Sequence, residues 1–115
     1  MNQTITKADL NQFTGTTRYF QHWSKKFKYT DGVFFVAEAA GAYWLIDLIA
    51  SYQPLDEEFQ VWTLKKEGDF CHVECTDGND VPLIRQDLDY TDFPEEIMPF
   101  SMYLQNNVLF LTSEY

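Results

Sequence analysis

The stretch Val33–Tyr52 reads VFFVAEAAGAYWLIDLIASY, and its apolar residues recur every three or four positions. This spacing is typical of one face of an α-helix. Around Trp44–Ile49 almost every side is apolar, so we expect this part to be buried against a sheet. Gly41 leaves open whether the stretch is one kinked helix or two helices. The sequence therefore predicts a central helix over roughly residues 33–52.

After Pro54, which ends the helical pattern, the hydrophobic period changes to two. Period two is typical of strands, whose side chains alternate between the two faces of a sheet. Asn106-Asn107 tolerates positive φ and predicts a hairpin turn near the C-terminus. The expected strands are Phe59–Lys66, Phe70–Thr76, Leu83–Tyr90, Phe100–Leu104 and Val108–Thr112.

The N-terminal part predicts one further helix. Thr6 has the form of an N-cap and opens a short helix over roughly Lys7–Phe13, which Gly15 closes. Thr16–Trp23 is β-branched and aromatic and fits either an edge strand or an irregular arm. We therefore expect one α+β domain over residues 1–115. Its sheet is an antiparallel meander of about five strands, packed on one face by the central helix.

The net charge of −10 is distributed unevenly along the chain. Residues 1–55 carry four acidic and five basic side chains, a balance of +1, whereas residues 56–96 carry thirteen acidic and three basic ones, a balance of −10. Direct binding of nucleic acid requires clustered Lys and Arg, so the sequence argues against it. Acidic surfaces most often serve solubility alone.

Targeting signals and membrane spans are absent from the sequence pattern. No apolar run reaches the roughly 18 residues that a spanning helix needs. The first residues lack a basic start followed by an apolar stretch, so we expect a cytoplasmic protein that does not contact membranes.

Cys71 and Cys75 are predicted to be reduced and free of metal. On one strand they lie roughly 13 Å apart, beyond the reach of a disulfide. Both share a face with Val73, where a free cysteine packs as a small apolar residue. A second pair of zinc ligands is missing, so we expect no metal and no cofactor.

Several strings resemble a family of small, uncharacterised bacterial proteins, a domain of unknown function. They occur in the family's order and cover nearly the whole chain. The resemblance implies a single complete domain with native ends, and it implies no activity. The strings are LNQFTG (Leu10–Gly15), YTDGV (Tyr29–Val33), GAYWLIDLIAS (Gly41–Ser51), FQVWTL (Phe59–Leu64), YTDFP (Tyr90–Pro94) and SEY (Ser113–Tyr115).

The pattern of possible catalytic residues predicts no catalytic site. His22 and His72 have no Ser, Cys or Asp partner at a recognisable spacing. His72 is expected to face away from Val73, as an ordinary surface or half-buried histidine. Asp77-Gly78-Asn79-Asp80 lacks the spacing of a calcium loop and predicts a hairpin turn.

Two aspartates invite a closer interpretation. Asp31 precedes Gly32 at an expected helix start, where an acid caps the helix. Asp47 lies in an apolar helix, where an unpaired carboxylate would be costly. We expect Asp47 to accept a hydrogen bond from a Tyr or Trp, or to reach the surface.

The sequence favours a non-enzymatic, acidic protein-binding module. Asp87 and Asp89 should point to solvent together, and Asp77 and Asp80 in the preceding turn extend the same strip. These four aspartates are the predicted partner-binding residues. In its sharpest form, the hypothesis is an inhibitor that imitates nucleic acid and occupies a basic groove on a nucleic-acid-binding or host-defence protein.

An alternative hypothesis comes from another functional class. It is a small enzyme or ligand-binding domain with a pocket around Tyr43, Trp44 and Asp47, which Asp31 could join. A closed apolar pocket containing Asp47 would favour it. Neither hypothesis fixes the oligomeric state, and a homodimer is compatible with both.

Overall fold

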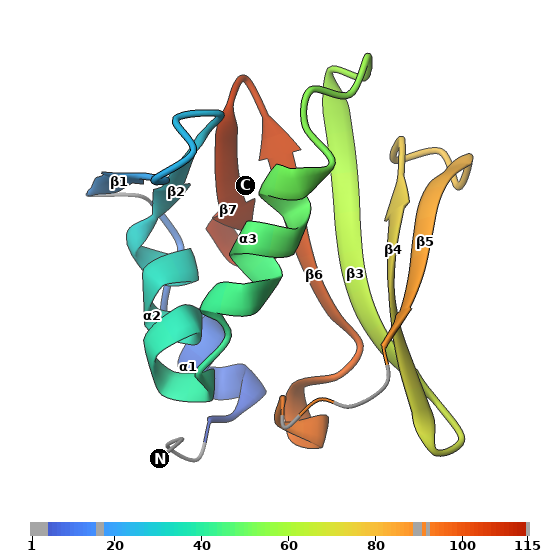
Figure 1. Ribbon diagram of the computed structural model, residues 1–115. Helices are drawn as coiled ribbons and strands as arrows, with labels where there is room; N and C mark the ends of the chain where they lie inside the picture. The colour runs from blue at the N-terminus through green and yellow to red at the C-terminus, as the bar shows by residue number, and fades with distance from the viewer. Residues whose placement is uncertain (1–4, 16–17, 89–90, 92, 115) are drawn as a thin grey trace.

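One mixed sheet forms the centre of the molecule, with strand order β1-β2-β7-β6-β3-β4-β5 (Figure 1). The computed structural model describes residues 5–15, 18–88, 91 and 93–114. The strands are β1 (Tyr19–Gln21), β2 (Lys28–Thr30), β3 (Phe59–Glu67), β4 (Phe70–Thr76), β5 (Pro82–Leu88), β6 (Phe100–Gln105) and β7 (Val108–Leu111). The helices are α1 (Lys7–Asn11), α2 (Asp31–Ala40), α3 (Tyr43–Ser51), and the short 3-10 turns η1 (Glu95–Ile97) and η2 (Thr112–Glu114).

Strands β3, β4 and β5 form the expected antiparallel meander. Trp62 lies opposite Cys75, and Val73 lies opposite Leu64 and Gln86. Burial alternates along β3, so every second side chain faces the core. The period-two pattern of the sequence is therefore confirmed here. The predicted end of the third strand, Asp89 and Tyr90, lies outside the described residues.

The prediction of about five strands in a purely antiparallel meander was wrong. The sheet has seven strands, and β2 pairs with β7 in parallel. The β6–β7 hairpin pairs with the free edge of β3 instead of following β5. Its turn at Asn106 and Asn107 has positive φ at both residues, as predicted. Segment 18–30 supplies β1 and β2, each only three residues long.

The predicted central helix over 33–52 consists of two helices. Gly41 adopts φ 62° and ψ 38°, the left-handed conformation that glycine accepts without the clash of a Cβ. It caps α2, and α3 begins two residues later, at Tyr43. The chain can therefore turn between the two helices while both remain packed on the sheet.

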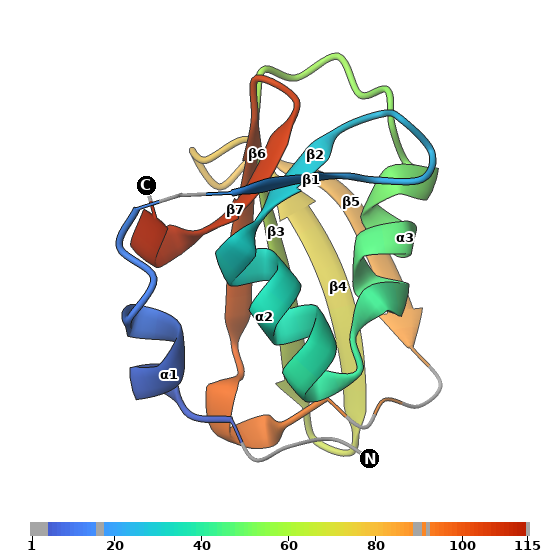
Figure 2. The same cartoon turned by 90° about the vertical axis from the view of Figure 1, so that its left-hand side faces the viewer.

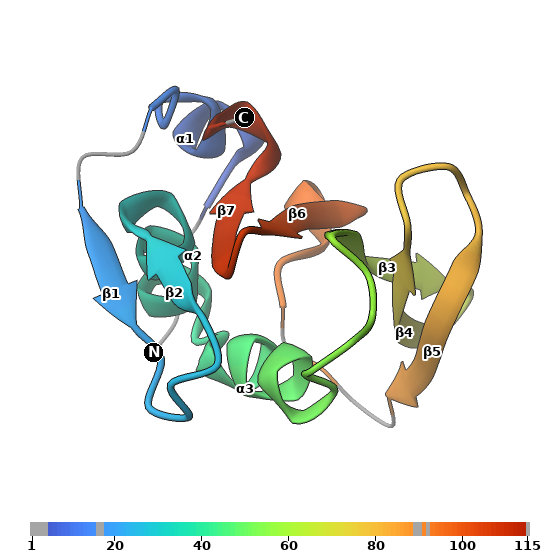
Figure 3. The same cartoon turned by 90° about the horizontal axis from the view of Figure 1, so that it is seen from above.

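Helices α2 and α3 lie on the same face of the sheet (Figure 2). Seen from above, the sheet curves around α3, and β5 and β1 are its two edges (Figure 3). The core lies between these layers, and Trp62, Leu64 and Val73 of the sheet are each 1% exposed. From the helices, Val33 and Ile49 are as deeply buried. The α+β class with helical cover on one face follows from this arrangement.

Helix α1 begins at Lys7, as predicted, but it ends at Asn11 with Gln12 as its C-cap, so Gly15 does not close it. Thr6 and Asp9 make a reciprocal capping box, in which each side chain accepts the backbone N–H of the other residue. Ser113 Oγ donates to the Leu10 carbonyl oxygen at 3.2 Å, which ties α1 to the C-terminal segment. In the part of the chain that the structure describes, every helix is too short or too polar to cross a membrane.

Candidate functional site

The three predicted partner-binding aspartates that the structure describes, Asp77, Asp80 and Asp87, lie in two separate places. Asp77 and Asp80 lie in the β4–β5 turn, whereas Asp87 lies near the other end of β5, opposite His72. At about 3.3 Å per strand residue, Asp80 and Asp87 are roughly 20 Å apart. Asp89 lies outside the described residues. Asp87 is exposed as predicted, but it lies at the opposite end of β5 from Asp77 and Asp80.

Two of these carboxylates already have partners within the fold. Asp77 Oδ1 accepts the backbone N–H groups of Asn79 at 2.8 Å and Val81 at 3.2 Å, so it builds the turn. Asp87 Oδ1 accepts from Arg85 Nε at 3.1 Å. Arg85, Lys65 and Lys66, the bases of segment 56–96, all lie in ion pairs with acids.

Five carboxylates without an ion pair lie at one end of the sheet. Segment 56–58 leads into β3, and the turn 77–81 joins β4 to β5 at the same end, because Val61 is in register with Thr76. Figure 1 shows both connections at the top of the molecule. We call Asp56, Glu57, Glu58, Asp77 and Asp80 the acidic end. Among the described residues, none of these five carboxylates forms an ion pair within 4.0 Å.

A cleft of about 560 Å³ opens beside the acidic end. It lies between the α3–β3 connection and the β6–β7 turn, and we call it the carboxamide cleft. Its lining combines five carboxamides with two carboxylates, one ammonium group and three apolar side chains. The lining residues are Lys26, Gln53, Pro54, Leu55, Glu57, Glu58, Gln60, Leu104, Gln105, Asn106 and Asn107.

A buried hydrogen-bond network forms the floor of the carboxamide cleft. Gln60 is 3% exposed, and its Oε1 accepts from Trp62 Nε1 and from Gln53 Nε2, both at 2.9 Å. In return, Gln60 Nε2 donates to Gln53 Oε1 at 3.2 Å and to the Glu57 carbonyl oxygen at 3.3 Å. Because each bond fixes the next, the floor is preorganised.

Lys26 forms one wall of the cleft and has a structural role. Its Nζ donates to the carbonyl oxygens of Ala50 at 3.1 Å and Gln53 at 2.9 Å. These carbonyls lie at the C-terminus of α3, where a cation stabilises the helix dipole. The β1–β2 loop is thereby attached to α3.

Asp47 is satisfied inside the fold, as predicted. Its Oδ1 accepts from Trp23 Nε1 at 2.9 Å and contacts His22 Nε2 at 2.7 Å. Its side chain is also 49% exposed. The backbone N–H of Ser24 donates to His22 Nδ1 at 3.1 Å, so Nε2 carries the proton that faces Asp47.

The contacts of His22 were missed at the level of sequence. Ser24 Oγ lies 2.7 Å from His22 Nδ1, which completes a chain from Ser24 through His22 to Asp47. Asp47 is 25 residues away from His22, so spacing rules could not pair them. The one signal in the sequence was that Asp47, in an apolar helix, needs a hydrogen-bond donor. Ser24 Oγ also accepts the Lys26 N–H at 3.3 Å, as a turn residue does.

The alternative site around Tyr43 and Trp44 has a different geometry from the one expected. The Tyr43 hydroxyl donates a hydrogen bond to Glu38 Oε1 at 2.5 Å. Burial raises the pKa of this hydroxyl, and the bond to Glu38 raises it further. Trp44 is half-buried against the core. The best-formed pockets of the described residues have other linings, which do not include Tyr43, Trp44 or Asp47.

Thr30, and not Asp31, provides the N-cap of α2. Thr30 Oγ1 accepts the Val33 N–H at 3.3 Å, while Asp31 is the first residue of the helix and accepts the N–H of Gly32. Thr30 Oγ1 also donates to Glu114 Oε1 at 2.7 Å, and the Leu111 N–H donates to the same oxygen at 2.8 Å. Burial raises the pKa of the Glu114 carboxyl.

The two cysteines are free thiols on β4, as the strand assignment implies. Cys75 is fully buried, and burial raises the pKa of its thiol to about 12. It is therefore a poor nucleophile and a poor metal ligand. In the described ranges, no three His, Cys, Asp or Glu side chains converge as a metal ion would require.

His72 is more deeply buried than expected. It lies on the face of β4 opposite Val73, as predicted, but is only 2% exposed. Glu67 lies 3.6 Å from its Nδ1 and Glu74 lies 3.7 Å from its Nε2. Charged neighbours on β3 and β4 therefore cover the imidazole ring.

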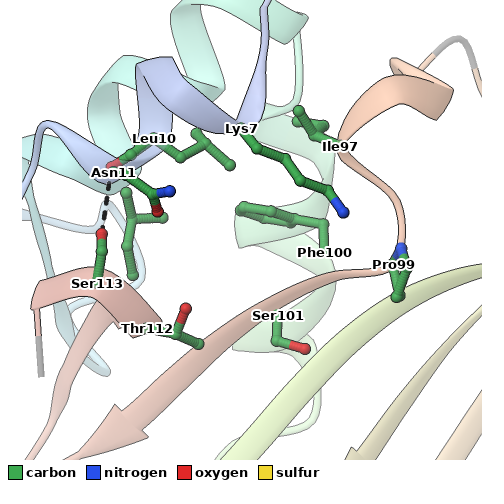
Figure 4. Close-up of a pocket in the computed structure, with 10 residues that line it drawn as sticks. Lys7, Leu10, Asn11, Ile97, Pro99, Phe100, Ser101, Thr112 and Ser113 are labelled. Carbon is green, nitrogen blue, oxygen red and sulfur yellow. Dashed lines mark hydrogen bonds between the residues drawn. The ribbon is translucent and has the colours of Figure 1, made fainter.

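A second, smaller pocket lies between α1 and the sheet, with a volume of about 160 Å³. Lys7, Leu10 and Asn11 line it from α1, and Phe100 and Ser113 line it from the C-terminal segment. Figure 4 shows the hydrogen bond from Ser113 to Leu10 along one side. Its small size is that of a packing gap where α1 docks on the sheet.

Comparison with known proteins gives a family and no functional relative. No curated protein and no solved structure matches the chain. A family model matches residues 4–115, which is nearly the whole chain. The match agrees with the predicted resemblance to a domain of unknown function. The chain belongs to the family of unknown function DUF6876.

Proposed function

We propose that this protein is a non-enzymatic binding module that captures a protein with a basic surface. The observation that carries the proposal is the acidic end. Its carboxylates have no basic partner among the described residues, whereas the three bases of segment 56–96 are all paired elsewhere. A surface with one sign of charge attracts a partner of opposite sign and accelerates association.

The narrower hypothesis, imitation of a nucleic-acid backbone, has less support than the general one. Mimicry needs carboxylates that are evenly spaced and free to bind. Asp77 is engaged by its own turn, and Asp87 is engaged by Arg85. We therefore place partner binding at the acidic end rather than along β5.

The proposal is tested by affinity purification from the native host, followed by mass spectrometry and by kinetics with the purified partner. We expect a partner with a basic surface and an association rate that falls steeply as salt rises, because exposed charges are screened. An association rate that does not depend on salt, or a partner without a basic surface, would contradict the proposal.

A second candidate function is hydrolysis through Ser24, favoured by the hydrogen-bond chain from Ser24 to His22 and Asp47. Nucleophile, base and orienting acid stand in the order that acyl transfer uses. It ranks second because Ser24 lines none of the pockets described above, and the Lys26 N–H already occupies its hydroxyl. Labelling of Ser24 by a fluorophosphonate, lost in Ser24→Ala and His22→Gln, would favour this candidate over the binding module.

A further inference from the structure

The carboxamide cleft has the form of a ligand site rather than of a gap in packing. Its volume of about 560 Å³ lies in the range of small-ligand sites. Its walls come from segments far apart in sequence, the α3–β3 connection and the β6–β7 turn, and Lys26 closes one side. Its floor is rigid, because Gln60 and Gln53 exchange hydrogen bonds in both directions.

The charged groups of the cleft that are not already held by hydrogen bonds within the fold are acceptors. The donors of Gln53 and Gln60 are occupied, since each amide nitrogen already serves two oxygens. Glu57 and Glu58 contribute two carboxylates, which only accept hydrogen bonds, and Gln105, Asn106 and Asn107 contribute carboxamides, which can accept or donate. A ligand that donates several hydrogen bonds is therefore favoured over one that accepts them.

The charge of the cleft selects a cation. Glu57 and Glu58 outnumber Lys26 in the lining. The Lys26 ammonium is directed at the α3 carbonyls, where two bonds hold it. The acidic end adjoins the cleft, so the surrounding field also attracts positive charge. Anions and neutral apolar molecules are disfavoured.

We propose that the carboxamide cleft receives an arginine side chain of the basic partner protein. This inference rests on the proposed function and assigns the partner's anchoring group. A guanidinium is planar, always charged and presents five N–H donors, which suits the carboxylates of Glu57 and Glu58 and the carboxamides that line the cleft. A lysine ammonium is compact and strongly hydrated, and fits such a site less well.

The five carboxamides allow a direct test by nuclear magnetic resonance. The ¹⁵N-labelled chain is titrated with N-acetylarginine amide, and the side-chain amide signals of Gln53, Gln60, Gln105, Asn106 and Asn107 are followed. N-acetylcitrulline amide, which has the same shape without the charge, is the matched control, and N-acetyllysine amide tests the preference for guanidinium. We expect saturable shifts of these signals with the arginine probe and at least about tenfold weaker binding of citrulline, the scale of one charged hydrogen bond.

Two variants locate the effect. Glu57→Gln with Glu58→Gln should weaken the arginine probe at least about tenfold, because the anionic acceptors are lost. Asp69→Asn with Glu96→Gln removes the same charge from exposed positions outside the cleft and should leave binding within about twofold. Equal binding of arginine and citrulline, shifts confined to other residues, or no shifts with the arginine probe would overturn the proposal.

Failure of this inference is distinguishable from failure of the proposed function. If a basic partner is captured in a salt-dependent manner by wild type and by the Glu57, Glu58 variant alike, the binding module stands and the cleft is not its anchor. If no salt-dependent partner exists but arginine still binds the cleft, the site is a small-ligand site instead. Only the first outcome leaves the proposed function intact.

Discussion

The carboxylate of Glu114 and those of the acidic end show two contrasting uses of the same functional group. Glu114 lies in a partly buried place near the start of α2, where its Oε1 accepts hydrogen bonds from the Thr30 hydroxyl and from the Leu111 N–H. The acidic end has no basic partner in the described part of the chain and faces solvent or the carboxamide cleft. Charges that are tied to backbone donors build the fold, and within the acidic end this holds for Asp77. Charges left without partners remain available for another molecule.

The largest loss of stability is expected from Gly32→Ala, which disturbs the surroundings of the Glu114 carboxylate. A Cβ at Gly32 would lie 2.8 Å from Glu114 Cδ and Oε1 and 2.8 Å from Leu111 Cδ1. The carboxylate cannot withdraw without losing its bonds to Thr30 and Leu111. We expect a loss of about 2–3 kcal/mol in the free energy of unfolding, measured by urea denaturation.

Gly15→Ala is the matched control for that substitution. A Cβ at Gly15 meets nothing within 4 Å. Its stability should change by no more than about 0.5 kcal/mol, as is usual for surface positions. Equal effects at Gly15 and Gly32 would show that the Glu114 contact does not restrict Gly32.

The pH dependence of stability also tests the role of the Glu114 carboxylate in the fold. Burial raises the folded pKa of Glu114 above its unfolded value, so the folded state binds its proton more tightly. Stability contributed by this proton is present below the unfolded pKa and is lost as pH rises through the folded pKa. As pH rises from the unfolded pKa through the folded pKa, the wild-type protein should therefore lose stability relative to Glu114→Gln.

Thermal or urea unfolding of both proteins across mildly acidic pH measures this difference. Glu74 has the opposite sign, because its hydrogen bond to Lys65 lowers its pKa. Its contribution is present above the unfolded pKa and is lost as pH falls through the folded one. Comparison with Glu114→Gln isolates the Glu114 slope, since Glu74 is common to both. If the difference in unfolding free energy between the two proteins stays constant with pH, burial does not raise the pKa of Glu114.

Asp47 lies between the two extremes, since it is half-exposed and still bonded to His22 and Trp23. Asp47→Asn keeps an oxygen acceptor at the same place, so we expect the fold to persist with a loss of about 1–2 kcal/mol. Asp56→Asn, an exposed position, is the control and should change stability by less than about 0.5 kcal/mol. A gain in stability with loss of a measured activity would instead favour the hydrolytic candidate.

Local patterns predicted much of the fold, and long-range pairings set the rest. The period of two along β3 and the positive φ at Asn106 and Asn107 are local, and both were predictable. Strand β2 has three residues, and its partner Val108 lies 80 positions after Lys28, so no local signal marks it. The break at Gly41 depends on a single backbone conformation, which periodicity alone leaves open.

The candidate site was less predictable than the fold. The acidity of segment 56–96 was visible in the sequence, but which carboxylates lack partners depends on ion pairs such as Arg85 with Asp87. The carboxamide cleft joins Gln53, Gln60 and Gln105 from three separate segments, and their side chains follow no shared spacing. Cross-segment geometry of this kind is available only once the sheet order is known.

The smallest effect on stability, and the largest on binding, is expected from neutralising the acidic end. The variant Asp56→Asn, Glu57→Gln, Glu58→Gln, Asp80→Asn leaves the turn-forming Asp77 in place. Exposed charges without partners contribute little to the fold, so we expect its unfolding free energy to stay within about 1 kcal/mol of wild type. A larger loss would show that these carboxylates are structural.

The association rate of this variant with the purified basic partner, measured from low to high salt, tests the central claim most directly. We expect the rate at low salt to fall by at least about tenfold and its salt dependence to flatten, because the charges that steer encounter are gone. A variant that associates at the wild-type rate with the wild-type salt dependence would contradict the account and leave the acidic end as a solubility feature.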